Sequence, residues 1–202
     1  NWLPKVVSVE TIMAIGMTEP IAGSDLQGIQ TKAERDGNHF VLNGQKVWIS
    51  NGQIADLYII ACKTDPKEGA KGISLILVEG DREGFKRGKN LEKIGYKAQD
   101  TSELFFEDVR VPITNLLGQE GRGFAQLMQQ LPQERLVVAI RCATALEAAL
   151  NETIRYTKER KAFGRSISDF QNTRFKLAEV KTLAMVTRAF TDQCIQLHLE
   201  GK

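Results

Sequence analysis

The pattern of hydrophobic positions changes its period once along the chain. Between about Ile12 and Asn115, short apolar runs alternate with loops rich in Gly, Asp, Pro and Lys, which is typical of β-strands. After Gly121-Arg122-Gly123, apolar residues recur at intervals of three and four, which is typical of amphipathic helices. The chain is therefore predicted to be α+β, with an antiparallel β-barrel or sandwich followed by part of an α-helical bundle.

The β segment contains one hairpin signal and three further strand signals. The apolar runs His39–Leu42 and Gln45–Ile49 flank Asn43-Gly44, and Asn-Gly between two such runs is the strongest short-range signal for a hairpin turn. Pro112 is predicted to end the last strand, because proline has no N–H to donate to a ladder. The other strands are predicted at Leu57–Cys62, Ile73–Val78 and Leu104–Val111.

The helical segment predicts one short helix and two long ones. Phe124–Leu131 has the pattern of a short helix, and Pro132 fits the first turn of a long helix that runs to about Arg160. A break at Gly164 precedes the second long helix, at about Asp169–Leu199. Because two long helices make only half a bundle, we expect further helices or a second subunit to cover them. The positions predicted to be buried are Val138, Cys142, Ala145, Ala149 and Ile154 on the first long helix and Phe175, Leu177, Val180, Leu183, Ala184, Phe190, Cys194 and Leu197 on the second.

Composition and charge exclude several classes of protein. Lys and Arg number 27 and Asp and Glu 25, and this net charge of +2 is too balanced for a nucleic-acid-binding or membrane-surface protein. No apolar run reaches the roughly 18 residues of a membrane span. Two histidines, without CxxC or HExxH spacing, predict no metal site. Cys62, Cys142 and Cys194 lie far apart in apolar stretches and are predicted to be reduced core thiols. The chain begins without Met, so we expect that parts of the protein are missing on both sides.

Three segments are candidates for binding a nucleotide-like group, and each has a structural alternative. Met17–Asp25 carries small residues and hydroxyls suited to a pyrophosphate, or it is a structural loop. In Val47–Gly52, Trp48 beside Ser50 could flank a planar heterocycle, or Trp48 packs in the core. The basic segment Tyr156–Arg165 could hold a phosphate, or it is a solvated helix end.

Glu134 is a candidate general base. It lies in Leu131–Leu136, in the first turn of the predicted long helix, where a carboxylate also complements the helix dipole. Taken alone, the dipole interpretation is the simpler one. As a base, Glu134 would act once bound substrate excludes water.

Four segments occur in an order that carries more information than any one of them: Thr18–Asp25, Leu42–Gly52, Phe106–Pro112 and Glu159–Gly164. Together they resemble the acyl-CoA dehydrogenase family. The resemblance spans essentially the whole chain, and the combination of motifs is highly specific. Lys97–Asp108 and Leu131–Leu136 look most like the long-chain members of the family.

This resemblance implies a three-domain protein and an assembly. Residues 1–12 are then the tail of an N-terminal helical domain, residues 13–117 a middle β domain, and residues 118–202 the first part of a C-terminal helical domain. Family members are homotetramers, or dimers of the same pairing, that share FAD across a subunit pair. The isolated piece of 202 residues is expected to be inactive and to bind FAD poorly.

The resemblance also implies contact residues. Arg160 and Gln171 are expected to reach the FAD bound mainly to the other subunit. Ile21 departs from the family pattern, because relatives often have Gly there and a Gly turn can need a different φ. The expected FAD contacts within the subunit are Ile15, Met17, Thr18, Gly23, Ser24, Trp48, Ile49 and Ser50. The expected acyl-CoA contacts are Ser24, Lys71, Ala125, Pro132, Gln133, Glu134 and Arg135.

The reaction that the resemblance implies gives Glu134 a role. A carboxylate takes the α-proton of an acyl-CoA while the β-hydride passes to flavin N5, and the product is a trans-2-enoyl-CoA. Long-chain and isovaleryl members carry this base at the position of Glu134. Electron-transferring flavoprotein is the expected electron acceptor, and the bacterial cytoplasm or the mitochondrial matrix the expected compartment.

Two alternatives remain open at this point. One is an acyl-CoA oxidase or related flavoenzyme, which shares the scaffold and is reoxidised by oxygen. The other is a non-catalytic family member that serves as an assembly or scaffold subunit. The intact Glu134 and the intact flavin motifs argue against the second alternative.

Overall fold

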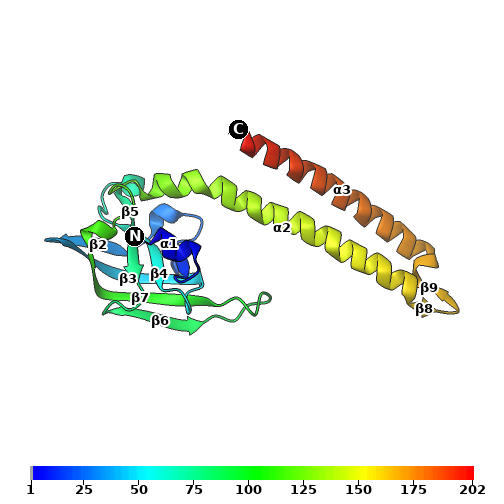
Figure 1. Cartoon of the computed structure of the whole chain (residues 1–202), viewed down its shortest axis with the longest axis horizontal. Coiled ribbons are helices and arrows are strands. Elements are labelled where there is room, and N and C mark those ends of the chain that lie inside the picture. The colour runs from blue at the N-terminus through cyan, green and yellow to red at the C-terminus, as the bar shows by residue number, and fades with distance from the viewer. Residues whose placement is uncertain (1) are drawn as a thin grey trace. The chain divides into compact units, whose positions relative to one another are not determined.

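The computed structural model describes residues 2–202, which form two units. The first unit extends to Met128 and is built around a β-sheet, and the second, Gln129–Lys202, is mostly helical (Figure 1). The predicted α+β class is confirmed, with a mixed-sheet half-barrel followed by helices. Helix α2 (Gly123–Glu159) begins in the first unit and contributes most of its length to the second.

A seven-stranded sheet organises the first unit, and a short helix α1 (Leu3–Val7) precedes it. The strands lie in the order β1-β4-β2-β3-β7-β6, and β5 pairs with β4. Strand β1 runs parallel to β4, as does the single pairing of β2 with β4, so the sheet is mixed, whereas the sequence predicted an antiparallel one. Alternation along a strand does not encode the direction of its partner. The strands are β1 (Met13–Gly16), β2 (Lys32–Asp36), β3 (His39–Ser50), β4 (Leu57–Lys63), β5 (Ile73–Glu79), β6 (Phe85–Asn90) and β7 (Thr101–Pro112).

The predicted hairpin turn at Asn43-Gly44 is wrong. Both residues lie inside β3, which pairs with β7 on either side of them. The ladder of a long strand outweighs the local preference of Asn-Gly for a turn. Gly44 instead forms an irregularity with φ +148°, where the register of β3 against β7 shifts. The actual hairpin turn is Gly37-Asn38, which joins β2 to β3, and Gly37 has φ +57°.

Three of the strands carry no clear sequence signal. Strands β2 and β6 are mostly charged or polar, and β1 is only four residues long, so none shows the alternation that predicts a strand. The predictions for the more apolar strands are confirmed: β4, β5 and β7 contain the predicted runs, and Pro112 is the last residue of β7.

The core of the first unit consists of two clusters of buried side chains. The larger cluster joins β3, β4 and β7, and its bulkiest buried members include Tyr58 and Phe40. The smaller cluster includes Leu127 from the start of α2. Cys62 is buried as predicted, and burial raises the pKa of its thiol to about 12. Cys142 is exposed, so it is not the core thiol that the sequence predicted, and no disulfide joins the described residues.

The predicted helix boundary at Pro132 is also wrong. Helix α2 is continuous, with Pro132 in its interior. Proline removes one backbone hydrogen bond and disfavours the helix, but the flanking Gln, Glu, Leu and Met residues are strong helix formers. After α2, the short strands β8 (Lys161–Ala162) and β9 (Arg165–Ser166) form a hairpin at the predicted break, where Gly164 has φ +76°. Helix α3 (Gln171–Leu199) follows. Short 3₁₀ turns lie at Leu26–Gly28, Gly69–Gly72, Ile113–Asn115 and Ile167–Asp169.

Small side chains and one ion pair join α2 to α3. Ala143 and Leu150 of α2 and Ala184 of α3 are buried. Arg188 of α3 makes a bidentate contact with Glu147 of α2, with Nε–Oε1 at 2.9 Å and Nη2–Oε2 at 2.6 Å. The face of α2 that packs is therefore offset from the predicted stripe, whose members Val138, Cys142, Ala145 and Ala149 are exposed.

Much of the apolar surface of the second unit is exposed. An apolar pocket of about 470 Å³ is lined by the part of α2 from Leu146 to Thr157 and the part of α3 from Asn172 to Val180, with Ile167. Large side chains that the sequence predicted to be buried on α3 are exposed in the chain by itself: Phe175, Val180, Leu183, Phe190 and Leu197. This surface agrees with the expectation that further helices or another subunit cover the pair.

Two kinds of feature are absent from residues 2–202. No helix among them is long and apolar enough to cross a membrane. No group of three or more His, Cys, Asp and Glu side chains within that range is arranged to hold a metal ion.

The irregularity at Gly44 predicts a sharp sensitivity to substitution. A Cβ at Gly44 would lie 2.5 Å from Thr31 Oγ1 and 2.7 Å from Thr31 Cα, in a conformation that L-residues rarely adopt. We expect Gly44→Ala to lower the free energy of unfolding by about 3 kcal/mol, measured by urea denaturation. Gly95→Ala is the matched control, because a Cβ at Gly95 meets no atom within 4 Å. If the Gly44→Ala protein were as stable as the Gly95→Ala protein, the close approach of Gly44 to Thr31 would not require glycine.

Candidate functional site

Two segments that are far apart in the sequence lie side by side in the first unit. The Val47 N–H donates to the Thr18 carbonyl at 2.9 Å. At the other end, Asn51 Nδ2 donates to the Met13 carbonyl at 3.2 Å. The structure therefore brings residues 13–18 against residues 47–51. These residues overlap two of the three segments that are candidates for binding a nucleotide-like group, Met17–Asp25 and Val47–Gly52.

Trp48 is presented outward by a distorted strand. Its φ is +62°, its register against β7 is interrupted between Lys46 and Ile49, and its side chain is 56% exposed. The alternative of a core tryptophan is therefore wrong. Ser50 is exposed and pairs with Thr101 at the end of β3. Ile49 is only 2% exposed and lies in the core, so its side chain is not available to a ligand.

The loop after β1 forms a turn that leaves small residues accessible. Glu19 and Ala22 exchange backbone hydrogen bonds at 2.9 and 3.1 Å. Gly23 and Ser24 are exposed, and a Cβ at Gly23 would meet no atom within 4 Å. Ile21 is 73% exposed and has no positive φ, so the turn does not require glycine there.

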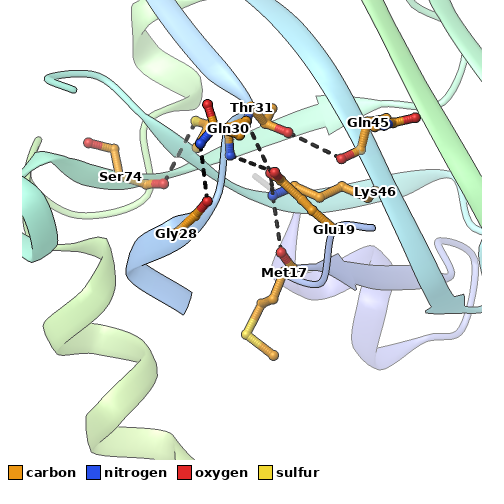
Figure 2. Close-up of polar contacts among 9 residues, drawn as sticks. Met17, Glu19, Gly28, Gln30, Thr31, Gln45, Lys46 and Ser74 are labelled. Atoms are coloured by element: carbon orange, nitrogen blue, oxygen red, sulfur yellow. Dashed lines mark hydrogen bonds and ion pairs between the residues drawn. The ribbon is translucent and has the colours of Figure 1, made fainter. Parts of the chain in front are cut away.

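A buried ion pair links the loop after β1 to β3 (Figure 2). Lys46 Nζ lies 2.7 Å from Glu19 Oε1, with the two side chains 0% and 3% exposed. Lys46 Nζ also donates to the Met17 carbonyl at 3.1 Å. The backbone N–H groups of Gln30 and Thr31 donate to the two Glu19 carboxylate oxygens at 2.5 and 3.0 Å.

The environment of the pair determines the charge state of both groups. Burial favours the neutral acid for Glu19, but the Lys46 charge and three donated hydrogen bonds outweigh it, so the pKa of Glu19 lies below its ordinary 4.5. Burial lowers the pKa of Lys46 from its ordinary 10.5, and the Glu19 carboxylate partly counters that effect. The pair could not be predicted from the sequence, because Glu19 and Lys46 occur in separate motifs and no local pattern indicates that they meet.

Two candidate acyl-CoA contacts of the first unit, Lys71 and Ala125, lie near the start of α2. Lys71 is exposed, and Ala125 is half-buried in the first turns of the helix. Gly121, with φ +74°, packs against the Lys71 carbonyl and donates its N–H to Ser74 Oγ at 2.9 Å. The glycine-rich entry into α2 thus holds the loop of Lys71 beside the helix.

The remaining candidates belong to the second unit. Glu134 is exposed in the interior of α2, and not in a first turn as predicted, so the dipole interpretation fails. Among residues 2–202 no cation forms a salt bridge with it. Arg160 follows α2, and Gln171 begins α3 across the β8–β9 hairpin. The other candidates in α2, which are all exposed, are Pro132, Gln133 and Arg135.

Two family models together match most of the chain. The model of the acyl-CoA dehydrogenase middle domain matches residues 14–109, and that of the acyl-CoA dehydrogenase C-terminal domain matches residues 121–202. The chain belongs to the acyl-CoA dehydrogenase family. Members of this family are oxidoreductases, and FAD is their cofactor.

Individual relatives agree with this assignment. The chain is 52% identical over 200 residues to the mitochondrial long-chain specific acyl-CoA dehydrogenase of Sus scrofa, covering 98% of the chain and 46% of that protein. It is 43% identical over 192 residues to the mitochondrial isovaleryl-CoA dehydrogenase of Pongo abelii, covering 94% and 45%. A solved acyl-CoA dehydrogenase from Geobacillus kaustophilus is 54% identical, with a TM-score of 0.97 over 100% of this chain and 53% of that one. The chain thus spans about half the length of these relatives.

The lowered pKa of Glu19 predicts a pH-dependent stability. Its ionised form stabilises the fold fully above its ordinary pKa of 4.5, and this contribution is lost as the pH falls through the lowered value. We expect Lys46→Met to lower the free energy of unfolding at pH 7 by about 3–5 kcal/mol, because it leaves a buried carboxylate unpaired. The deficit should narrow at acid pH, where Glu19 takes up a proton. Urea denaturation between pH 7 and pH 3 measures both effects.

A second Lys–Glu pair provides the control. Lys86 Nζ also lies 2.7 Å from a carboxylate, Glu107 Oε2, but the two side chains are 62% and 68% exposed. Lys86→Met should cost less than about 1 kcal/mol at any pH in this range. If Lys46→Met and Lys86→Met lower the free energy of unfolding equally, the buried Glu19 carboxylate does not depend on Lys46 for its stabilisation.

Proposed function

We propose that the complete protein catalyses the FAD-dependent α,β-dehydrogenation of a long-chain fatty acyl-CoA to a trans-2-enoyl-CoA. Family membership supports the chemistry, and the identity to a long-chain specific relative supports the substrate class. The observation that carries the proposal is the juxtaposition of residues 13–18 and 47–51, which exposes Trp48 and two hydroxyl-bearing segments together.

The residues present fit the flavin. An exposed aromatic ring at Trp48 can flank the isoalloxazine, and the Ser50 and Thr18 segments offer donors and acceptors for its polar edge. The open space at Gly23 and the exposed Ser24 suit the approach of a pyrophosphate. Bound FAD supplies the hydride acceptor. The proposed contacts within the subunit are Ile15, Met17, Thr18, Gly23, Ser24, Trp48, Ser50 and the backbone of Ile49.

Glu134 is the proposed base. A base must reach the α-carbon of the substrate without being held in another ion pair, and Glu134 has an exposed carboxylate of this kind on α2. Arg135, Gln133 and Pro132 are proposed to contact the acyl-CoA beside it. Ser24, Lys71 and Ala125 are proposed as its contacts in the first unit. Glu134 then takes the α-proton as the β-hydride leaves.

The proposal extends to assembly and partners. Arg160 and Gln171 are proposed to contact the FAD of another subunit in a homotetramer or dimer. The exposed apolar faces of α2 and α3 support such an assembly, because they need a covering surface. Electron-transferring flavoprotein is the proposed electron acceptor. The bacterial cytoplasm or the mitochondrial matrix is the proposed compartment, since relatives come from both sources.

Substitution of Glu134 tests the base directly. In the full-length holoenzyme, we expect Glu134→Gln to lower kcat with palmitoyl-CoA by about 100- to 10,000-fold, because the amide keeps the size of the carboxylate and cannot take a proton. FAD content should be unchanged. Stopped-flow reduction of the flavin by substrate measures the chemical step.

The control for this experiment lies on the same helix. Glu152 is an exposed carboxylate of α2 that pairs with Arg155 at 2.5 Å, and Glu152→Gln should keep the wild-type rate of flavin reduction. If Glu134→Gln reduces its flavin at the Glu152→Gln rate, the base lies elsewhere.

The fate of the electrons separates the proposal from the oxidase alternative. After anaerobic reduction by acyl-CoA, we expect air to reoxidise the flavin slowly and electron-transferring flavoprotein to reoxidise it much faster. Peroxide is measured in parallel. Rapid, stoichiometric peroxide formation would support an acyl-CoA oxidase, and no reduction by any acyl-CoA would support a non-catalytic member.

A further inference from the structure

The buried Glu19–Lys46 pair connects the two segments of the proposed flavin site. Glu19 lies one residue after Thr18 and four before Gly23, and Lys46 lies two residues before Trp48. The pair therefore joins the loop after β1 to β3, between the backbone positions that lead to Gly23 and to Trp48 (Figure 2 shows the pair).

The network around the pair fixes the backbone on both sides. Lys46 Nζ holds the Met17 carbonyl, and one residue further on, the Val47 N–H holds the Thr18 carbonyl. On the other side of the loop, the Glu19 carboxylate accepts hydrogen bonds from the backbone N–H groups of Gln30 and Thr31. The loop that contains Glu19 is thus joined to β3 by the hydrogen bonds at Met17 and Thr18. The Glu19 carboxylate joins the same loop to residues 30–31, just before β2.

Packing around the lysine stem is equally tight. A Cβ at Gly16, the last residue of β1, would lie 3.3 Å from Lys46 Cγ and 2.8 Å from Ile60 Cδ1. The stem therefore fills the space beside β1, and it has little freedom to move.

Trp48 shows why such an anchor is needed. A bulky residue at φ +62° is strained, and a strained conformation persists only where the surrounding structure determines it. Ile49 in the core fixes the chain after Trp48, and the buried Lys46 fixes it before. Between these two points the strand can only bulge outward, and the bulge carries the exposed indole.

We propose that Glu19 and Lys46 are positioning residues that hold the loop Met17–Ser24 and Trp48 in the geometry that binds the flavin. This inference rests on the proposed FAD site. Neither side chain touches the cofactor, because both are buried. Their effect on FAD is exerted through Met17, Thr18 and Trp48.

The test uses the full-length holoenzyme stripped of FAD and titrated again. We expect Lys46→Met to raise the Kd for FAD at least tenfold, measured by quenching of flavin fluorescence, and to change the visible circular dichroism of the bound flavin. Glu19→Gln, which keeps the shape of the side chain, should show the same changes to a smaller degree. If Lys46→Met does not fold, the Kd and the circular dichroism of Glu19→Gln decide the test.

Two control variants separate positioning from stability. Lys86→Met removes the exposed partner of Glu107 at the same 2.7 Å distance and should leave the Kd and the dichroism unchanged. Val111→Ala opens a cavity in the same core, at a residue of β7 that pairs with Phe40, and should lower stability without changing the dichroism.

Each outcome has a distinct meaning. If both Lys46→Met and Glu19→Gln bind FAD with the Kd of the wild-type protein and leave the circular dichroism of the bound flavin unchanged, the positioning role is overturned and the proposed function stays intact. The same would follow if Val111→Ala weakened FAD binding and changed the dichroism as much as Lys46→Met. A wild-type protein that takes up no FAD would overturn the proposed function, and this inference with it.

Discussion

The buried ion pair between Glu19 and Lys46 is the interaction on which the local structure of the candidate site depends. An ammonium and a carboxylate that are both withdrawn from water need one another, and each also needs further hydrogen bonds. Here those hydrogen bonds come from the backbone at Met17, Gln30 and Thr31. Satisfying the charges therefore fixes three backbone segments at once: the loop after β1, residues 30–31 and β3. The first and the last of these contain proposed cofactor contacts.

Strand β3 supplies the second constraint. It pairs with β7 along most of its length, yet the pairing is interrupted near Gly44 and again around Trp48. Each interruption has a separate effect. At Gly44 the backbone passes so close to Thr31 that no side chain fits, and at Trp48 it turns an aromatic ring out of the sheet. In a regular strand, Trp48 would lie on the same face as Lys46, which is buried, so the irregularity is what exposes the ring.

The second unit has a different basis. Helices α2 and α3 meet through small buried residues such as Ala143 and Ala184, with a bidentate contact between Arg188 and Glu147. That interface uses only part of the apolar surface, and large side chains such as Phe175 and Phe190 stay exposed. A carboxylate at Glu134 is exposed on α2 in the same way. The role proposed for it needs the covering surface and the bound substrate to exclude water.

The sequence by itself determined the α+β class, the position of the change from strands to helices, the more apolar strands and the helix break at Gly164. It also determined the family, because four motifs in order are specific where each one is weak. Local patterns report these features directly. The tertiary structure alone decided that Asn43-Gly44 continues a strand, that Pro132 lies inside a helix and that β1 runs parallel to β4. It also decided that Lys46 meets Glu19. At Asn43-Gly44 and at Pro132, the surrounding structure outweighs a local preference that is worth only about 1–3 kcal/mol. The direction of β1 and the Glu19–Lys46 contact depend on long-range pairing and burial, for which the local sequence carries no signal.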